Sequence, residues 1–263
     1  MLFHTFGKQL IRIITLCVFC TANASAADKG QTINIVGSEW PPYITKHDMT
    51  KGAAMDLVTR VFRRAGYNPV SRIETWPRTL EGTKIGIYDV IAAVWYTPER
   101  NKKLHYSDPY FENVIRFVKE KGTTIRFRDL SDLKGLIIGV VDNYAYGKEF
   151  DDAKGLIKVS NNHVIQNLLL LQQGRIDLTL GDQWVIRNEL TRYFPTASKE
   201  FEFFGKPVSK RKLHIAVSRA NPGHERIIAA FNKALKAMKA DGTYAKILAR
   251  HRKRLIKLQE TPL

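Results

Sequence analysis

Short apolar strands alternate with amphipathic helices along most of the chain, and this alternation restricts the fold more than any other feature. Such an order is typical of α/β proteins, in which helices cover an open sheet. The predicted strands are residues 32–38, 68–74, 88–95, 135–141, 156–160, 176–182 and 211–219. The predicted helices are residues 53–66, 76–86, 163–174, 224–242 and 243–251, and residues 146–155 are helical or irregular. At 263 residues and 44% hydrophobic content, the chain can bury one large core or two modest ones.

One short pattern occurs at two places. A helical stretch ends in glycine, two residues follow, and aspartate opens an apolar strand, as in Gly86–Val90 and Gly174–Leu178. Ordinary helix-to-strand turns often contain these residue types, so the repeat can have a purely local cause. It also agrees with two similar α/β lobes. Ligands of such sheets bind beyond the carboxyl ends of the strands, which here means residues 95–100 and 182–184.

The first 26 residues predict a cleaved secretory signal peptide. Lys8 and Arg12 precede an apolar stretch, and Ala24-Ser25-Ala26 offers a cleavage site. This apolar stretch is shorter than the roughly 18 to 20 residues that a membrane span requires. Both cysteines lie inside this segment, so the mature protein would have no disulfide and no cysteine metal site.

Positive charge dominates the chain, with a formal net charge of +17. Export disfavours nucleic acid as a partner. The charge then indicates a solvated basic surface, attraction to anionic lipid headgroups, or steering of an anionic ligand. The densest basic cluster, Arg250–Lys257, follows an amphipathic helix where membrane or partner docking is conceivable. The seven histidines lack metal-ligand spacing, so neither a metal nor a cofactor is expected.

Several blocks together resemble a known family. The blocks "SEWPPYI", "TPERNKKLHYSDPYFEN", "LLLLQQGRIDLTLGD" and "KALKAMKADGTYAKIL" are similar, in order and spacing, to bacterial extracellular solute-binding proteins of the polar amino-acid ABC-transporter type. The resemblance covers nearly all of the mature chain. It implies a type II periplasmic binding protein fold, in which two α/β lobes, each a mixed sheet flanked by helices, are joined by a two-strand hinge.

Lobe 1 would comprise residues 27–117 and 213–263, and lobe 2 residues 118–212. The chain would cross between the lobes near residues 114–122 and 209–217. The resemblance further implies a monomer in the periplasm that captures a small anionic or zwitterionic ligand, such as an amino acid. It would deliver this ligand to an ABC permease in the inner membrane.

The resemblance assigns charged anchors to two residues. Arg100, in the "TPER" block, would bind the ligand's α-carboxylate, which a planar guanidinium matches in shape and charge. A surface ion pair with Asp108 is the alternative role. Asp182 follows the "GRID" strand and would receive the ligand's ammonium group. It could instead, or as well, cap the helix that begins after it.

Other residues complete the candidate cleft. The aromatic candidates are Trp40, Tyr43, Trp76, Trp95, Tyr96 and Tyr144. These rings can stack on an apolar or cationic part of a ligand, or they can belong to the core. Glu39 is a candidate contact for a cationic group, and Arg78 for a second anionic group.

Two departures from the family pattern leave the ligand open. Many members carry small hydroxyl residues before the arginine loop and at the start of the second lobe's first helix, where this chain has Ala93–Trp95 and Asn143–Ala145. Two further function classes also stay open: a ligand sensor for a membrane receptor, and a dehydratase-like enzyme on the same fold. Hydrolase and nucleotide-binding motifs are absent from the sequence, so a binding protein without catalysis is expected.

Overall fold

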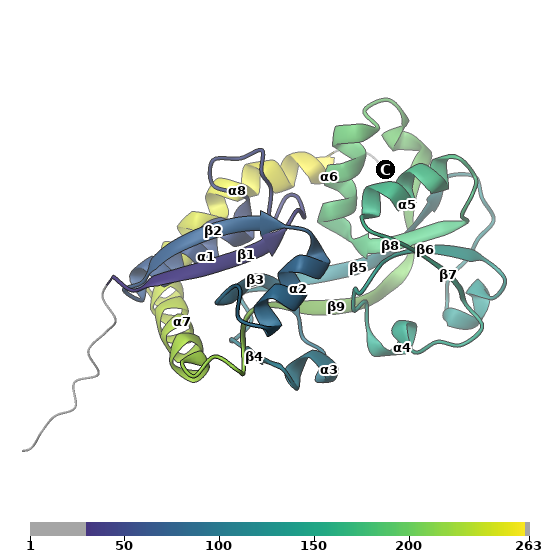
Figure 1. Ribbon diagram of the computed structural model, residues 1–263. Helices are drawn as coiled ribbons and strands as arrows, with labels where there is room; N and C mark the ends of the chain where they lie inside the picture. Colours follow the sequence, from purple (N-terminus) through teal and green to yellow (C-terminus); the bar gives the residue numbers. More distant parts are fainter. Residues whose placement is uncertain (1–29, 261–263) are drawn as a thin grey trace, which may run out of the picture.

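Two groups of elements, joined by a pair of long strands, make up the structure (Figure 1). The computed structural model describes residues 30–260, without the side chains of residues 252–260. The signal peptide predicted for residues 1–26 lies outside this range. Within it, no helix combines the length and apolar character needed to cross a membrane.

The first half lies on the left of Figure 1 and contains the beginning of the described chain, while the last helix starts there and extends toward the second half. Its strands are β1 (Thr32–Ser38), β2 (Asn68–Glu74), β3 (Val90–Trp95) and β4 (Leu104–Tyr106). Its helices are α1 (Ala53–Arg64), α2 (Trp76–Lys84), α3 (Pro98–Asn101), α7 (His224–Ala240) and α8 (Thr243–Glu260). The apolar stripe of α1 is buried, because this helix packs its inner face on β2 and β3.

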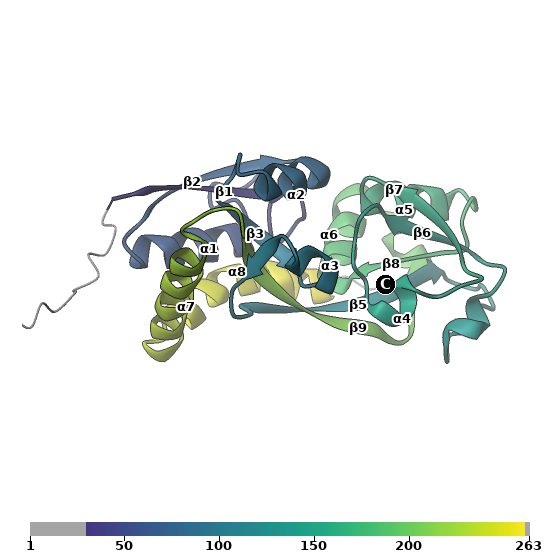
Figure 2. The same ribbon diagram turned by 60° about the horizontal axis from the view of Figure 1, so that its bottom comes forward.

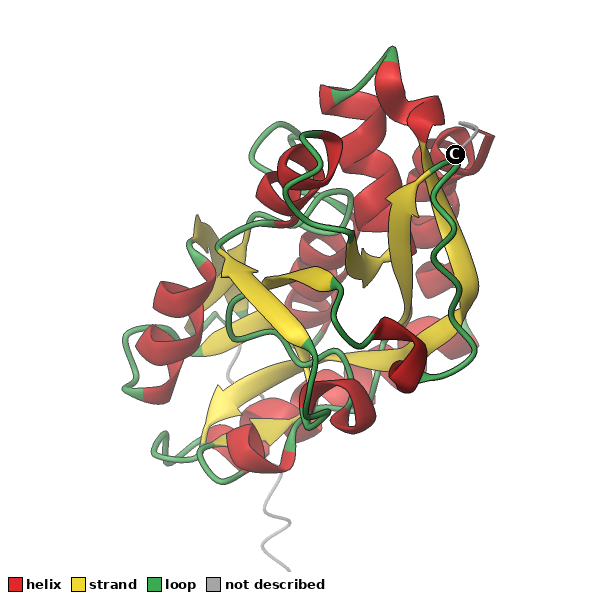
Figure 3. Cartoon of the chain, turned by 90° about the vertical axis from the view of Figure 1, so that its right-hand side faces the viewer, coloured by secondary structure: helices red, strands yellow, loops and turns green. Residues whose placement is uncertain are grey.

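The second half, on the right of Figure 1, is built from the middle of the chain. Its strands are β6 (Ile137–Val141), β7 (Ile157–Asn161) and β8 (Leu178–Asp182). Its helices are α4 (Lys148–Asp151), α5 (Val164–Gln172) and α6 (Gln183–Tyr193), with 3₁₀ turns at Leu130–Leu133 and Ala197–Glu200. Seen from the right-hand side of Figure 1, most helices lie around the outside of the strands (Figure 3).

The two halves are connected by β5 (Phe111–Glu120) and β9 (Phe201–Ser218), which run side by side in Figure 2. Within the described residues, a nine-stranded sheet has the order β2-β1-β3-β9-β5-β8-β6-β7, with β4 paired to β9 beside this path. The antiparallel β9 pairs with β3 near its C-terminal end and with β5 along most of its length. The crossings predicted at residues 114–122 and 209–217 overlap these two strands, and the lobe boundaries stay a prediction.

The repeated glycine–aspartate pattern has the same structural role in each half. Asp89 Oδ2 accepts a hydrogen bond from the backbone N–H of Asn34 in β1 at 2.7 Å. Asp177 Oδ2 accepts one from the N–H of Ile137 in β6 at 2.6 Å. Each carboxylate therefore ties the start of its own strand to the neighbouring parallel strand, and the two halves share a local architecture.

Most predicted elements are present, and the differences concern length. The stretch at residues 146–155 contains only the four-residue helix α4. The last helix extends to Glu260 instead of ending near residue 251, and it contacts α6 of the second half. Strand β9 begins at Phe201, ten residues before the predicted strand, because pairing with β5 orders its exposed polar part.

Candidate functional site

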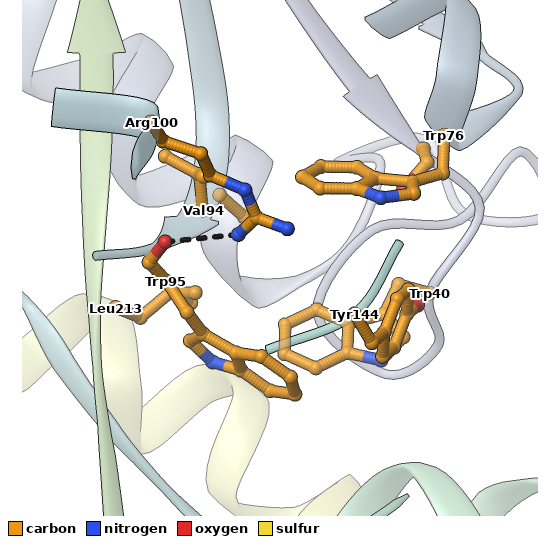
Figure 4. A pocket seen from close by; sticks show the side chains of 9 residues that line it. Trp40, Trp76, Val94, Trp95, Arg100, Tyr144 and Leu213 are labelled. Carbon is orange, nitrogen blue, oxygen red and sulfur yellow. Dashed lines mark hydrogen bonds between the residues drawn. The ribbon is translucent and has the colours of Figure 1, made fainter. Parts of the chain in front are cut away.

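A pocket lies between the halves, beyond the carboxyl ends of β1, β3 and β6 (Figure 4). It encloses about 310 Å³, including space open to solvent. Its lining residues are Ser38, Trp40, Trp76, Ala93, Val94, Trp95, Arg100, Tyr144 and Leu213. We call it the Arg100 pocket. All but Tyr144 come from the first half or from β9, so the second half closes the pocket with one aromatic ring.

Arg100 points into this pocket from α3, the short helix that follows β3 (Figure 4). The helix starts sharply because Thr97 Oγ1 accepts a hydrogen bond from the Arg100 N–H at 3.0 Å. The guanidinium lies 5.2 Å from the centre of the Trp76 ring, a cation–π distance. Burial lowers the pKa of Arg100 from its usual value. The half-buried guanidinium is therefore positioned by the turn at Thr97 and by the Trp76 indole that it packs against.

The guanidinium also bridges the two halves. Its Nη1 donates to the Trp95 carbonyl at 3.0 Å, and its Nη2 donates to the Asn143 carbonyl in the second half at 2.5 Å. The indole N–H of Trp76 donates to the same Asn143 carbonyl at 3.3 Å. Asn143 has a φ of 57°, in the left-handed region that asparagine tolerates. This backbone turn directs the carbonyl oxygen across the cleft.

Aromatic rings pack edge to face around the remaining space. The ring centres of Trp95 and Tyr144 are 5.5 Å apart, and those of Trp76 and Tyr144 are 6.1 Å apart. The ring centres of Trp40 and Trp95 are also 5.5 Å apart. Aromatic pairs prefer such edge-to-face arrangements. The rings give the pocket apolar walls whose faces are electron-rich. The walls suit an apolar or cationic segment of a ligand.

Asp182 is buried and does not line the pocket. Its Oδ1 accepts hydrogen bonds from the N–H groups of Trp184 at 3.0 Å and Val185 at 3.1 Å, so it caps α6. Its Oδ2 accepts from Asn113 Nδ2 at 3.1 Å, and the Tyr43 hydroxyl also hydrogen bonds to this carboxylate. Burial raises the pKa of Asp182 to about 6. The capping role considered for this residue is present in the structure.

Tyr43 is buried with Asp182, and burial raises its pKa well above the usual value. Two other candidates lie away from the Arg100 pocket. The Arg78 side chain is 72% exposed and lies 3.7 Å from Glu74. Tyr96 is 44% exposed, with its ring against Tyr106. Neither Arg78 nor Tyr96 is among the residues that line this pocket.

A larger cavity adjoins the Arg100 pocket and shares Trp40 and Tyr144 with it. It encloses about 870 Å³, including open solvent, between the loop after β1 and one face of α6. Glu39 lines it from the first half, and Glu189 lines it from the second half. We call it the Glu39–Glu189 cavity. Burial raises the pKa of Glu189 to about 7, and the nearby Glu39 acts in the same direction.

Sequence reasoning found Glu39 but missed Glu189. The only sequence signal for Glu189 is its spacing from Val185, which puts both residues on one face of α6, and both line the cavity. That spacing does not reveal which part of the first half lies opposite. No group of three or more potential metal-binding side chains occurs among the residues that the structure describes.

Comparison with known proteins places this geometry in context. Residues 33–253 match the model of a family described as bacterial extracellular solute-binding proteins, family 3. The ABC transporter arginine-binding protein 1 of Escherichia coli K12 is 30% identical over 250 residues, which cover 91% of this chain and 97% of that protein. The lysine/arginine/ornithine-binding periplasmic protein of the same organism is 26% identical over 258 residues, covering 93% and 96%.

A solved structure agrees with these sequence relatives. An ancestral arginine-binding protein bound to arginine superposes with a TM-score of 0.72 and is 28% identical. The match covers 83% of this chain and 97% of that one. The type II periplasmic binding protein fold expected from the sequence is thereby confirmed.

Proposed function

Because the chain belongs to the bacterial extracellular solute-binding proteins of family 3, we propose that it captures a small carboxylate-bearing ligand between its halves and delivers it to an ABC permease. Binding of a solute is the family's role. We place the protein in the periplasm as an exported monomer that binds its ligand without turnover. Its periplasmic relatives and the predicted signal peptide support this placement.

The observation that carries the proposal is the orientation of Arg100. Its guanidinium is half-buried at the end of β3, lies against Trp76, and points into the space between the halves. A guanidinium stays charged in such surroundings and offers paired donors that match a carboxylate. The Asn143 carbonyl oxygen already accepts a hydrogen bond from Arg100 Nη2. The surroundings of the guanidinium therefore have room for an oxygen acceptor.

Closure of the halves would complete the site. Strands β5 and β9 connect the halves, and Tyr144 brings an aromatic ring from the second half against Trp76 and Trp95. Movement about the two strands would open and shut the pocket on a ligand. Because arginine is the ligand of several relatives, it is the first amino acid to test.

The test compares two arginine substitutions. Binding of amino acids and small organic acids to the mature protein is first screened by thermal shift, since a ligand that binds only the folded state raises the melting temperature. The ligand found is then titrated by calorimetry into Arg100→Ala and Arg78→Ala. We expect Arg100→Ala to lose at least about 30-fold in affinity, because an ionic partner of the carboxylate is removed. Arg78→Ala, exposed and outside the pocket, should bind as the wild type does.

Circular dichroism spectra would show that both variants remain folded. Unchanged affinity in a folded Arg100→Ala protein would contradict the proposed anchor, and release of a chemically altered ligand would contradict a purely binding role.

A further inference from the structure

Asn113 is a fully buried polar residue on β5, one of the two strands that connect the halves. It lines neither the Arg100 pocket nor the Glu39–Glu189 cavity, so it does not face a ligand in either space. A buried amide needs hydrogen-bond partners, because an unpaired polar group in such surroundings is costly. The partners of Asn113 therefore show what this side chain does.

The two ends of the Asn113 amide bond to residues of different halves. Its Oδ1 accepts from the indole N–H of Trp95 at 2.8 Å, and its Nδ2 donates to Asp182 Oδ2 at 3.1 Å. An indole N–H can only donate and a carboxylate can only accept, so these partners fix the orientation of the amide. One side chain thus joins a wall of the Arg100 pocket to the residue that caps α6.

Tyr43 brings the loop after β1 into the same group. Its hydroxyl makes side-chain hydrogen bonds with both Asp182 and Asn113. We call Tyr43, Trp95, Asn113 and Asp182 the Asn113 network, and all four residues are buried. Inside such a network a lost bond leaves a polar group that has no water to replace its partner. Each member therefore depends on the others for its hydrogen bonds.

Trp95 is in contact with the second half through its ring as well. The ring centre lies 5.5 Å from that of Tyr144 and 6.4 Å from that of Tyr146. Trp95 and Tyr144 both line the Arg100 pocket (Figure 4). The indole N–H is thus fixed through Asn113, while the ring packs on two tyrosines of the second half. The position of this pocket wall and the position of the second half are linked.

Separation of the halves would break bonds of the Asn113 network. Tyr43 and Trp95 belong to the first half, Asp182 belongs to the second, and Asn113 lies on a strand that runs between them (Figure 2). When the halves are apart, water can solvate the groups that are freed. When the halves are together, these groups depend on the Asn113 amide. Loss of the amide therefore disfavours the closed arrangement more than an open one.

We propose that Asn113 is a positioning residue for ligand binding: by bonding Trp95 on one side and Asp182 on the other, it holds a wall of the Arg100 pocket against the closed second half. The residue touches no ligand and acts through Trp95. This inference deepens the proposed function, and the part of it that concerns ligand affinity rests on that function. The part that concerns the arrangement of the halves can be tested without a ligand.

Two asparagine substitutions form a matched pair. Asn113→Leu keeps a side chain of similar size and removes the amide that joins the halves. Asn167→Leu does the same at another fully buried asparagine, on α5, whose Oδ1 accepts from Asn161 Nδ2 within the second half. Both variants should lose stability. We expect the first alone to change how the halves are arranged, and thermal melting would show that each remains folded.

The arrangement of the halves is measured between two spin labels by pulsed electron paramagnetic resonance. Both cysteines of the sequence lie in the predicted signal peptide, so labels can be attached at introduced cysteines. Lys102→Cys, after α3, and Lys148→Cys, at the start of α4, place one exposed label on each half. In Asn113→Leu the ratio of long to short distances should rise at least about fivefold without ligand, and Asn167→Leu should match the wild type.

An exchange of the two polar groups tests the hydrogen bonds themselves. Asn113→Asp alone places two carboxylates together, and Asp182→Asn alone places two amide donors together, so each should lengthen the distances. In the double variant the new carboxylate can accept from both the Trp95 N–H and the new amide, whose oxygen can still cap α6. We expect it to recover the wild-type distances, which a purely space-filling role would not produce.

Binding of arginine, measured by calorimetry, supplies the second readout. Asn113→Leu should weaken it at least about threefold, because the loosened Trp95 must be ordered when the ligand binds. Wild-type distances in a folded Asn113→Leu or Asn113→Asp protein would overturn the inference, as would an equal shift in Asn167→Leu or no recovery in a folded double variant. These outcomes need no ligand. Failure of the wild type to bind any amino acid or organic acid would instead contradict the proposed function.

Discussion

Among the carboxylates of the candidate site, Glu189 has the most strongly raised pKa. Its pKa of about 7 in the folded protein compares with a usual value of 4.5. At pH values between 4.5 and about 7, Glu189 holds a proton in the folded state that it has released in the unfolded state. The unfolded state therefore binds fewer protons there, and stability falls as the pH rises through this window. Asp182, with a pKa raised to about 6, also makes the stability of the folded state fall as the pH rises.

We expect Glu189→Gln to reduce this pH dependence. At about pH 8 the variant should be more stable than the wild type by on the order of 2 kcal/mol, which is roughly 5 °C in melting temperature. At about pH 4, where both side chains are neutral, the two proteins should melt alike. Melting curves recorded without ligand across this range would check the expectation, and parallel curves for the two proteins would contradict it.

At this scale, the sequence predicted some site residues better than others. Arg100 follows directly from a strand end, so its place in an α/β sheet could be anticipated, and three predicted tryptophans line its pocket. Asp182 was harder, because its hydrogen bonds depend on Asn113 and Tyr43, which come from distant segments. Glu189 depends on how the halves meet, and no local pattern contains that information.

Among the elements, the repeated turn is the feature that the sequence revealed most directly. Its glycines adopt positive φ values, 83° at Gly86 and 63° at Gly174, so each helical stretch can end and the chain can reverse. The aspartate that follows then binds the N–H of the adjacent parallel strand. The length of β9 was not predictable in the same way, because its exposed polar residues carry no apolar alternation and are ordered by pairing.

This geometry predicts the cost of losing the second aspartate. Asp177→Ala leaves the β6 N–H of Ile137 without its carboxylate partner, a charge-assisted bond of 2.6 Å. We expect a loss of about 1.5–3 kcal/mol in the free energy of unfolding, measured by urea denaturation. Asp152→Ala, which removes only an exposed ion pair with Lys148, should cost less than about 0.5 kcal/mol. Equal costs for the two variants would contradict the role assigned to Asp177.

For the molecule as a whole, two hydrogen bonds that join the halves at the pocket converge on one backbone oxygen, beside the ring contacts of Tyr144. Arg100 and Trp76 from the first half both donate to the Asn143 carbonyl of the second. Arg100→Ala should therefore shift the unliganded protein toward more open arrangements. Small-angle X-ray scattering should give it a larger radius of gyration than Arg78→Ala, which keeps the bridge. Identical scattering from the two variants would indicate that other contacts set the closed arrangement.

The pairing of β5 with β9 has a consequence for how such proteins can be recombined. Glu120 lies opposite Phe201 in the ladder, and the N–H of Lys121 donates to the carbonyl of Glu200 at 2.7 Å. Residues 121–200 thus begin and end at adjacent points of the paired strands β5 and β9. They resemble a long insertion into one β-hairpin. A chimaera that exchanges this segment with that of a relative would keep Arg100 and replace Tyr144 and Glu189 together. One graft would therefore exchange the ligand-facing residues of the second half and leave those of the first half unchanged.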